Sequence, residues 1–142
     1  MDQRLSFVTL GVQDLDRMKD WYTRMFGWTP LKDSDGIVFF RLNGFILGLF
    51  PAHELAEDIG LPAAGAEGFK RMTLAVCYPS EAAVDAVFDA LRQKGVRIVR
   101  APERVFWGGY RGYIADIEDN YWEIAFNPFL DLDADLNVVT HR

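Results

Sequence analysis

The sequence is poor in the residues that most often build reactive or metal-binding centres. Among its 142 residues there is 1 cysteine, Cys77, and there are 2 histidines, His53 and His141. A single cysteine excludes a disulfide within the chain and favours a reducing compartment. So few histidines leave few of the ring nitrogens that zinc and other transition metals prefer.

Basic residues and long apolar runs are also scarce. The chain has 15 Lys and Arg against 21 Asp and Glu, a formal net charge of −6, which argues against nucleic acid or an anionic membrane as a partner. No apolar run approaches the ~20 residues that span a bilayer. Met1–Leu10 contains Asp2 and Arg4 and lacks the apolar stretch of a signal peptide. We therefore expect a soluble, cytoplasmic protein.

Apolar residues are abundant, and their spacing indicates two copies of one unit. Half of the residues are hydrophobic, enough for a sizeable core. Val8–Val12 and Met72–Val76 have the alternation of strands and share Thr, Leu and Val in the same order. Each is followed by an amphipathic helical stretch with a capping residue before it and a glycine after it. These stretches predict helices over Asp14–Phe26 and Ser80–Lys94.

Short strands are predicted after each glycine, so each half has the order βαβββ. The first set is Trp28–Lys32, Ile37–Leu42 and Phe45–Phe50, and the second is Val96–Arg100, Tyr110–Asp116 and Tyr121–Asn127. We expect an α+β protein with modules at 1–51 and 69–128. The Ala-, Gly- and Pro-rich segment 52–68 is expected to link them, and 129–142 to form an acidic tail.

The segment Tyr121–Asn127 alternates large apolar residues with small or polar ones, the pattern of a half-buried strand. Glu123 falls on the opposite face from Trp122 and Ile124. A carboxylate in the middle of a strand is costly to bury without a partner. Glu123 is therefore the candidate catalytic residue, and what it contacts distinguishes a metalloenzyme from a binding protein.

These motifs together resemble the vicinal oxygen chelate superfamily, which includes glyoxalases, bleomycin-resistance proteins and dioxygenases. The resemblance covers residues 4 to 128 and rests on the following segments: Phe7–Leu15, Trp21–Tyr22, Phe26–Trp28, Gly112–Tyr113 and Asp116–Glu123. It implies paired βαβββ modules whose curved mixed sheet encloses a cavity, and it implies a homodimer. In such proteins the ligand or substrate is a small molecule.

The resemblance also gives positions for metal ligands, and here they carry unsuitable residues. The four positions fall at Phe7, Ile46, Arg71 (or Thr73) and Glu123. Divalent metals need several deprotonated N, O or S ligands, whereas this set offers one carboxylate beside two hydrocarbons and a permanent cation. We therefore expect no metal and no other cofactor, with Arg71 or Arg111 pairing with Glu123.

Three functions remain open at this stage. The first is a metal-independent small-molecule binding protein. The second is a lyase- or isomerase-type enzyme that uses Glu123 as acid or base. The third is a structural or partner-binding domain whose cavity is filled by side chains. The expected ligand-binding residues are Phe7, Thr9, Ile46, Arg71, Thr73, Trp107, Arg111, Tyr113 and Glu123.

Overall fold

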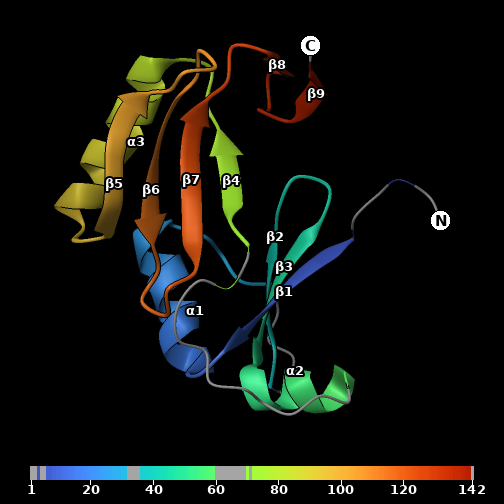
Figure 1. Ribbon diagram of the computed structural model, residues 1–142. Helices are drawn as coiled ribbons and strands as arrows, with labels where there is room; N and C mark the ends of the chain where they lie inside the picture. Colours follow the sequence, from blue (N-terminus) through green and yellow to red (C-terminus); the bar gives the residue numbers. More distant parts are fainter. Residues whose placement is uncertain (1–2, 4–5, 32–35, 60–69, 71, 142) are drawn as a thin grey trace. The chain divides into compact units, whose positions relative to one another are not determined.

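The computed structural model describes residues 3, 6–31, 36–59, 70 and 72–141, and it divides into two compact units (Figure 1). Unit 1 spans Met1–Ala66 and unit 2 spans Glu67–Arg142. Each unit combines helices with a mixed sheet, which confirms the predicted α+β class. Of the helices in the described ranges, none has the length and apolar character needed to cross a membrane.

Unit 1 is a three-stranded sheet with a helix on each face. Its sheet has the order β1-β3-β2, with β1 parallel and β2 antiparallel to the central strand. Its elements are β1 (Phe7–Val12), α1 (Leu15–Met25), β2 (Val38–Arg41), β3 (Ile46–Pro51) and α2 (Ala52–Ile59).

Helix α1 forms where the sequence predicts it, because its capping residues and its apolar stripe all indicate the same segment. The Asp14 side chain caps the first turn by accepting from the Arg17 amide at 3.0 Å. Gly27 ends the helix with φ of 72°, a left-handed value that glycine adopts without strain. Met18 and Tyr22 are fully buried against the sheet, and burial of such a side chain contributes about 1.5–3 kcal/mol.

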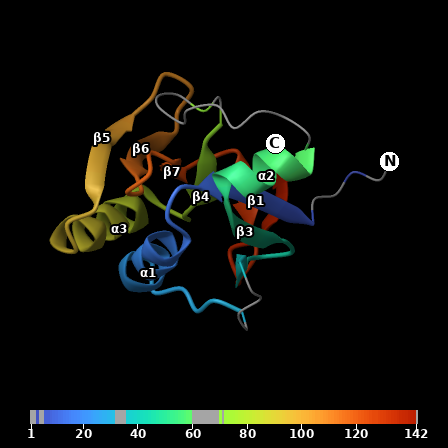
Figure 2. The same cartoon turned by 90° about the horizontal axis from the view of Figure 1, so that it is seen from below.

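Helix α2 occupies the first part of the segment 52–68 that the sequence predicts as a linker. It packs on β1 and β3, and Figure 2 shows it beside β1. A Cβ on Gly11 would lie 3.3 Å from Ala52 and 3.4 Å from Leu55, so the helix sits directly over the end of β1. The rest of the predicted linker lies outside the described residues.

The strand predicted at Trp28–Lys32 is wrong for its described part, because Trp28–Leu31 has no strand geometry. The Trp28 ring instead stacks on Tyr22 of α1 at 5.6 Å between centroids. Pro30 has no amide to donate to a neighbouring strand. The Leu31 amide bonds to β2, at 2.8 Å from the Phe39 carbonyl. Packing on the helix thus replaces the expected ladder.

Unit 2 has the predicted βαβββ order, followed by a hairpin. Its sheet has the order β4-β7-β6-β5, and α3 covers one face (Figure 1). Its elements are β4 (Leu74–Cys77), α3 (Glu81–Gln93), β5 (Arg97–Arg104), β6 (Tyr110–Ala115), β7 (Tyr121–Phe126), β8 (Leu130–Leu132) and β9 (Val138–His141). The last two strands pair within the segment that the sequence predicts as an acidic tail.

The observed strand registers give a different alignment of the two units from the one predicted from the sequence. In unit 1 the β1 residue opposite Ile46 is Phe7, and in unit 2 the β4 residue opposite Glu123 is Ala75. If Ile46 and Glu123 are equivalent, Phe7 corresponds to Ala75 and not to Arg71. The glycines that end α1 and α3 have the same separation in sequence as Phe7 and Ala75. The shared Thr, Leu and Val of the first strands therefore do not mark equivalent positions.

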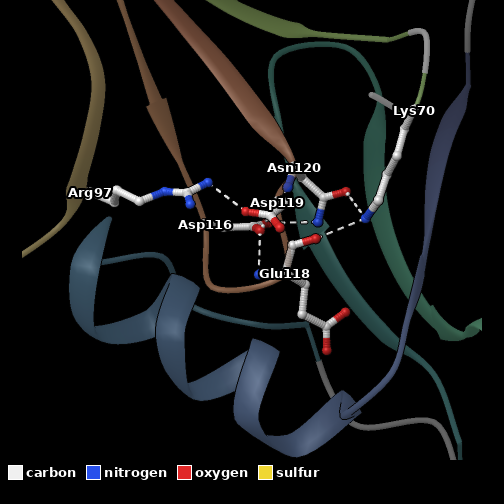
Figure 3. Close-up of polar contacts among 6 residues, drawn as sticks. All are labelled: Lys70, Arg97, Asp116, Glu118, Asp119 and Asn120. Atoms are coloured by element: carbon white, nitrogen blue, oxygen red, sulfur yellow. Dashed lines mark hydrogen bonds and ion pairs between the residues drawn. The ribbon is translucent and has the colours of Figure 1, made fainter. Parts of the chain in front are cut away.

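The turn between β6 and β7 sets the register of the strand that carries Glu123. The buried Asp116 carboxylate accepts from the amides of Glu118 and Asn120, both at 2.9 Å, and from the Asn120 side chain at 2.7 Å. Lys70 donates to the Glu118 carbonyl at 2.9 Å and to the Asn120 amide oxygen at 3.2 Å, and Arg97 pairs with Asp119 (Figure 3). Contacts from Lys70 and Arg97, together with those of Asp116, thus stabilise the turn between β6 and β7.

Candidate ligand-binding site

The candidate site lies on the face of the unit 2 sheet that is opposite α3. On the α3 face, Ile114 of β6 is opposite Trp122 of β7, and both are buried. Strand alternation places the intervening residues on the other face, which we call the polar face. Its residues are Arg111, Tyr113, Ala115, Tyr121, Glu123, Ala125, Ala75 and Cys77.

Glu123 and Tyr113 are directly opposite each other on β7 and β6. Burial raises the pKa of the Tyr113 hydroxyl, the charge of Glu123 raises it further, and the charge of Arg111 lowers it. The phenol is therefore protonated at neutral pH and is a donor group directly opposite the carboxylate. Tyr113 is thus the polar side chain that the described strands place across from Glu123, where the sequence predicted an arginine.

Arg111 is on the same face but pairs elsewhere. Its guanidinium lies 3.1 Å from the Glu103 carboxylate and 5.4 Å from the centre of the Tyr113 ring. The Arg111 side chain is only 14% exposed, whereas that of Glu103 is 45% exposed, so water still reaches this pair from the Glu103 side. Arg100 also pairs with Glu103, and the two arginines hold the pKa of that carboxyl below its usual value. The ion pairs of the described residues thus join Arg111 to Glu103 and not to Glu123.

Cys77 completes the polar face near the end of β4. It is opposite Ala125, two residues beyond Glu123. Burial, and after it the charge of Glu123, raise the pKa of the Cys77 thiol. A raised pKa keeps the sulfur protonated at neutral pH, so it is a poor nucleophile and a poor metal ligand.

Three of the predicted ligand-binding residues lie together in unit 1. Phe7 is opposite Ile46, and Thr9 is opposite Gly48. The Phe7 ring, half exposed, meets Phe39 edge-on at 5.8 Å. These residues share the face of the unit 1 sheet that is opposite α1, so the predicted strand alternation is correct there.

The remaining predicted residues are not brought to Glu123 by the contacts of the described chain. Thr73 is exposed and precedes β4. Trp107 lies in the β5–β6 loop, where its ring covers Gly109 so closely that a Cβ there would be 1.8 Å from it. Arg71 lies outside the described residues, and its pairing with Glu123 stays a prediction.

The residues present do not fit a divalent metal. With the observed register, the positions that correspond to the family's ligands carry Phe7, Ile46, Ala75 and Glu123. Three hydrocarbon side chains and one carboxylate cannot satisfy a tetrahedral or octahedral ion. Within the described ranges no three His, Cys, Asp or Glu side chains are grouped closely enough to hold one.

Glu103 and Lys70 were missed by the sequence analysis, for different reasons. Strand β5 has two register shifts, between Ile98 and Arg100 and between Arg100 and Glu103, so simple alternation does not place Glu103 beside Arg111. Lys70 falls in the predicted second module but outside any periodic segment. Its only sequence signal is a cation, next to Arg71, shortly before a strand.

Comparison with known proteins agrees with this architecture. Residues 4–124 match the family model of the Glyoxalase/Bleomycin resistance protein/Dioxygenase superfamily. The crystal structure of a glyoxalase-related enzyme from Fulvimarina pelagi is 34% identical, with 99% of each chain covered and a TM-score of 0.85. A glyoxalase/bleomycin resistance protein/dioxygenase from Nocardioides is 25% identical over 89% of this chain and 84% of its own, with a TM-score of 0.78.

A lactoylglutathione lyase from Agrobacterium tumefaciens shares the fold, at 24% identity over 89% of this chain and 96% of its own, with a TM-score of 0.70. No curated protein matches the sequence. The family match covers most of the chain, and the Fulvimarina relative covers nearly all of it. The chain therefore belongs to the glyoxalase/bleomycin resistance protein/dioxygenase superfamily.

Proposed function

We propose that this protein binds a small organic molecule on the polar face of unit 2, without a metal ion. The observation that carries the proposal is the surroundings of Glu123. Its carboxylate lies directly opposite Tyr113, on a face whose residues do not suit a metal. A face with an acid, two tyrosine rings and small residues offers an apolar surface with a few directed polar groups, as small-molecule sites do.

A thermal-shift screen of neutral aromatic fragments in EDTA tests the proposal. Because a ligand that binds only the folded protein stabilises it, we expect some fragments to raise Tm equally with and without EDTA. Tyr113→Phe removes the hydroxyl group opposite Glu123, so it should change those shifts. Tyr110→Phe makes the same chemical change at β6 on the α3 face and should leave them as they are.

Two outcomes would contradict the proposal. The first is a set of shifts that appears only after Zn²⁺, Ni²⁺ or Mn²⁺ is added and disappears with EDTA. The second is an equal response of the Tyr113→Phe and Tyr110→Phe proteins, because the polar face would then have no special role.

An enzyme is the second candidate, since the relative from Fulvimarina pelagi is described as a glyoxalase-related enzyme. The Glu123 carboxylate would accept a proton from carbon beside a carbonyl, and the Tyr113 hydroxyl would donate to the carbonyl oxygen. Exchange of the C–H protons of dihydroxyacetone in D₂O separates the candidates. An enzyme of this kind accelerates the exchange and loses that activity in Glu123→Gln, whereas a binding protein does not accelerate it.

A further inference from the structure

We propose that the ligand of the polar face is a cation, namely a protonated amine attached to an aromatic or apolar body. This inference rests on the proposed function and names the chemistry of its ligand. It follows from the balance of charges on the polar face, which leaves one carboxylate available.

Glu123 has more acceptor capacity than its contacts use. A carboxylate has about four lone-pair directions, and the Tyr113 hydroxyl opposite it can occupy only one of them. Among the ion pairs of the described residues, none includes Glu123. The half-buried carboxylate is partly removed from water, so a charged donor gains more there than at an exposed acid.

Arg111, the arginine that the described strands place on the polar face, is already paired. Arg111 is held by Glu103 at 3.1 Å and lies over the Tyr113 ring, and Arg100 contributes a second positive charge to the same carboxylate. An anionic ligand would have to compete with Glu103 for these guanidinium groups. A cationic ligand meets Glu123 without such competition.

The residue beside the carboxylate on β4 is small. It is Ala75, which is opposite Glu123 and exposed. Tyr121 provides an aromatic ring on the same face, and such rings attract ammonium groups and pack against apolar bodies. The chain's net charge of −6 adds a long-range field that favours the approach of cations.

Isothermal titration with three probes of the same ring system tests the charge preference. The probes are 2-naphthylmethylamine, which is protonated at neutral pH, neutral 2-naphthylmethanol and anionic 2-naphthoate. We expect the amine to bind at least ~10-fold more tightly than the alcohol, the usual gain from a charged hydrogen bond, and the naphthoate to bind most weakly.

Three variants locate the origin of this preference. Glu123→Gln should weaken the amine ~10-fold, to the level of the alcohol, and leave the alcohol unchanged. Glu57→Gln removes the same charge from an exposed position on α2 and should keep the preference. Glu103→Gln leaves Glu123 intact but frees Arg111 from its partner, so it should weaken the amine and strengthen the naphthoate. The last variant is informative even if Glu123→Gln fails to fold.

Several results would overturn the inference. Equal affinity for amine and alcohol would mean that the charge of Glu123 is already balanced within the chain, with Arg71 as the first candidate, and the proposed function would stand. If Glu57→Gln and Glu123→Gln weaken amine binding equally, the preference for the amine comes from the net negative charge of the chain and not from Glu123. If none of the three probes binds, the inference and the proposed function both fail.

Discussion

At the scale of single residues, a tyrosine is placed beside a carboxylate on both faces of the unit 2 sheet. Tyr113 is opposite Glu123 on the polar face, and Tyr110 donates to Asp85 of α3 at 2.7 Å on the other. The Asp85 bond, together with burial and the charges of Asp85 and Glu81, raises the pKa of Tyr110 to about 12. The pKa of Tyr113 is also raised, so both phenols keep their protons throughout the physiological range.

The Tyr110 bond predicts a specific loss of stability at high pH. Unfolded tyrosine loses its proton near pH 10, whereas folded Tyr110 keeps it to about 12. The folded state therefore binds more protons in this window, and its stability falls as pH rises from ~10 to ~12. Tyr110→Phe lacks this bond, so we expect it to be less stable than wild type at pH 7 by about 0.5–1 kcal/mol, because the bond is partly exposed.

Urea denaturation of both proteins at pH 7, ~10 and ~12 measures this effect. The difference between wild type and Tyr110→Phe is the informative quantity, because Tyr78 and Tyr113 also have a raised pKa and titrate in both. The difference should shrink as pH rises through the window. A difference that stays constant to pH ~12 would show that the Asp85 bond does not control the titration of Tyr110.

At the scale of secondary-structure elements, local sequence signals predict the features that depend on one element alone. The two predicted helices, α1 and α3, begin after the predicted capping residues, because Asp14 and Ser80 accept from the amides three residues later. Both helices end at the predicted glycines. The polar face could also be predicted, because alternation fixes which residues of β6 and β7 share a side.

Pairing between strands could not be predicted in the same way. The register that puts Ala75 opposite Glu123 depends on contacts between β4 and β7, which are distant in sequence. The contact between Glu103 and Arg111 could not be predicted by simple alternation, because β5 has bulges that shift its register. Strand Trp28–Lys32 was overpredicted because packing of Trp28 on Tyr22 outweighs its β propensity. Helix α2 was missed because the composition of the whole segment 52–68 concealed its amphipathic start.

Unit 2 contains two turns of the same design, and they form a matched pair for measurement. Asp133 accepts from the amides of Asp135 and Asn137 as Asp116 does from Glu118 and Asn120. In both turns the residue before the asparagine has a left-handed φ, 61° at Asp119 and 63° at Leu136. Asp116 is buried at 3% exposure, however, whereas Asp133 is exposed.

We expect Asp116→Ala to cost at least about 2 kcal/mol, because buried amide donors lose their acceptor and water cannot replace it. Asp133→Ala removes the same bonds where water can replace them, so its effect on the free energy of unfolding should be much smaller. Denaturant unfolding of the two variants provides the comparison. Equal effects would mean that the Asp116 turn does not contribute to stability through burial.

At the scale of the whole molecule, the chain has two units of related order, each with one sheet face opposite its first helix that carries the predicted site residues. Phe7, Thr9 and Ile46 lie on that face in unit 1, and Arg111, Tyr113 and Glu123 lie on it in unit 2. The family match spans both units. The homodimer that the family resemblance implies stays a prediction.

The central claim is that the polar face of unit 2 binds a small molecule without metal. The most direct test is a two-dimensional ¹H–¹⁵N NMR titration of the full chain with 2-naphthylmethylamine in EDTA. We predict saturable shifts of the amides of Ala75, Cys77, Tyr113 and Glu123, with the amides of α3 unchanged. Shifts confined to α3 or to the exposed Val138 and Val139 of β9, or shifts that require an added divalent metal, would contradict the claim.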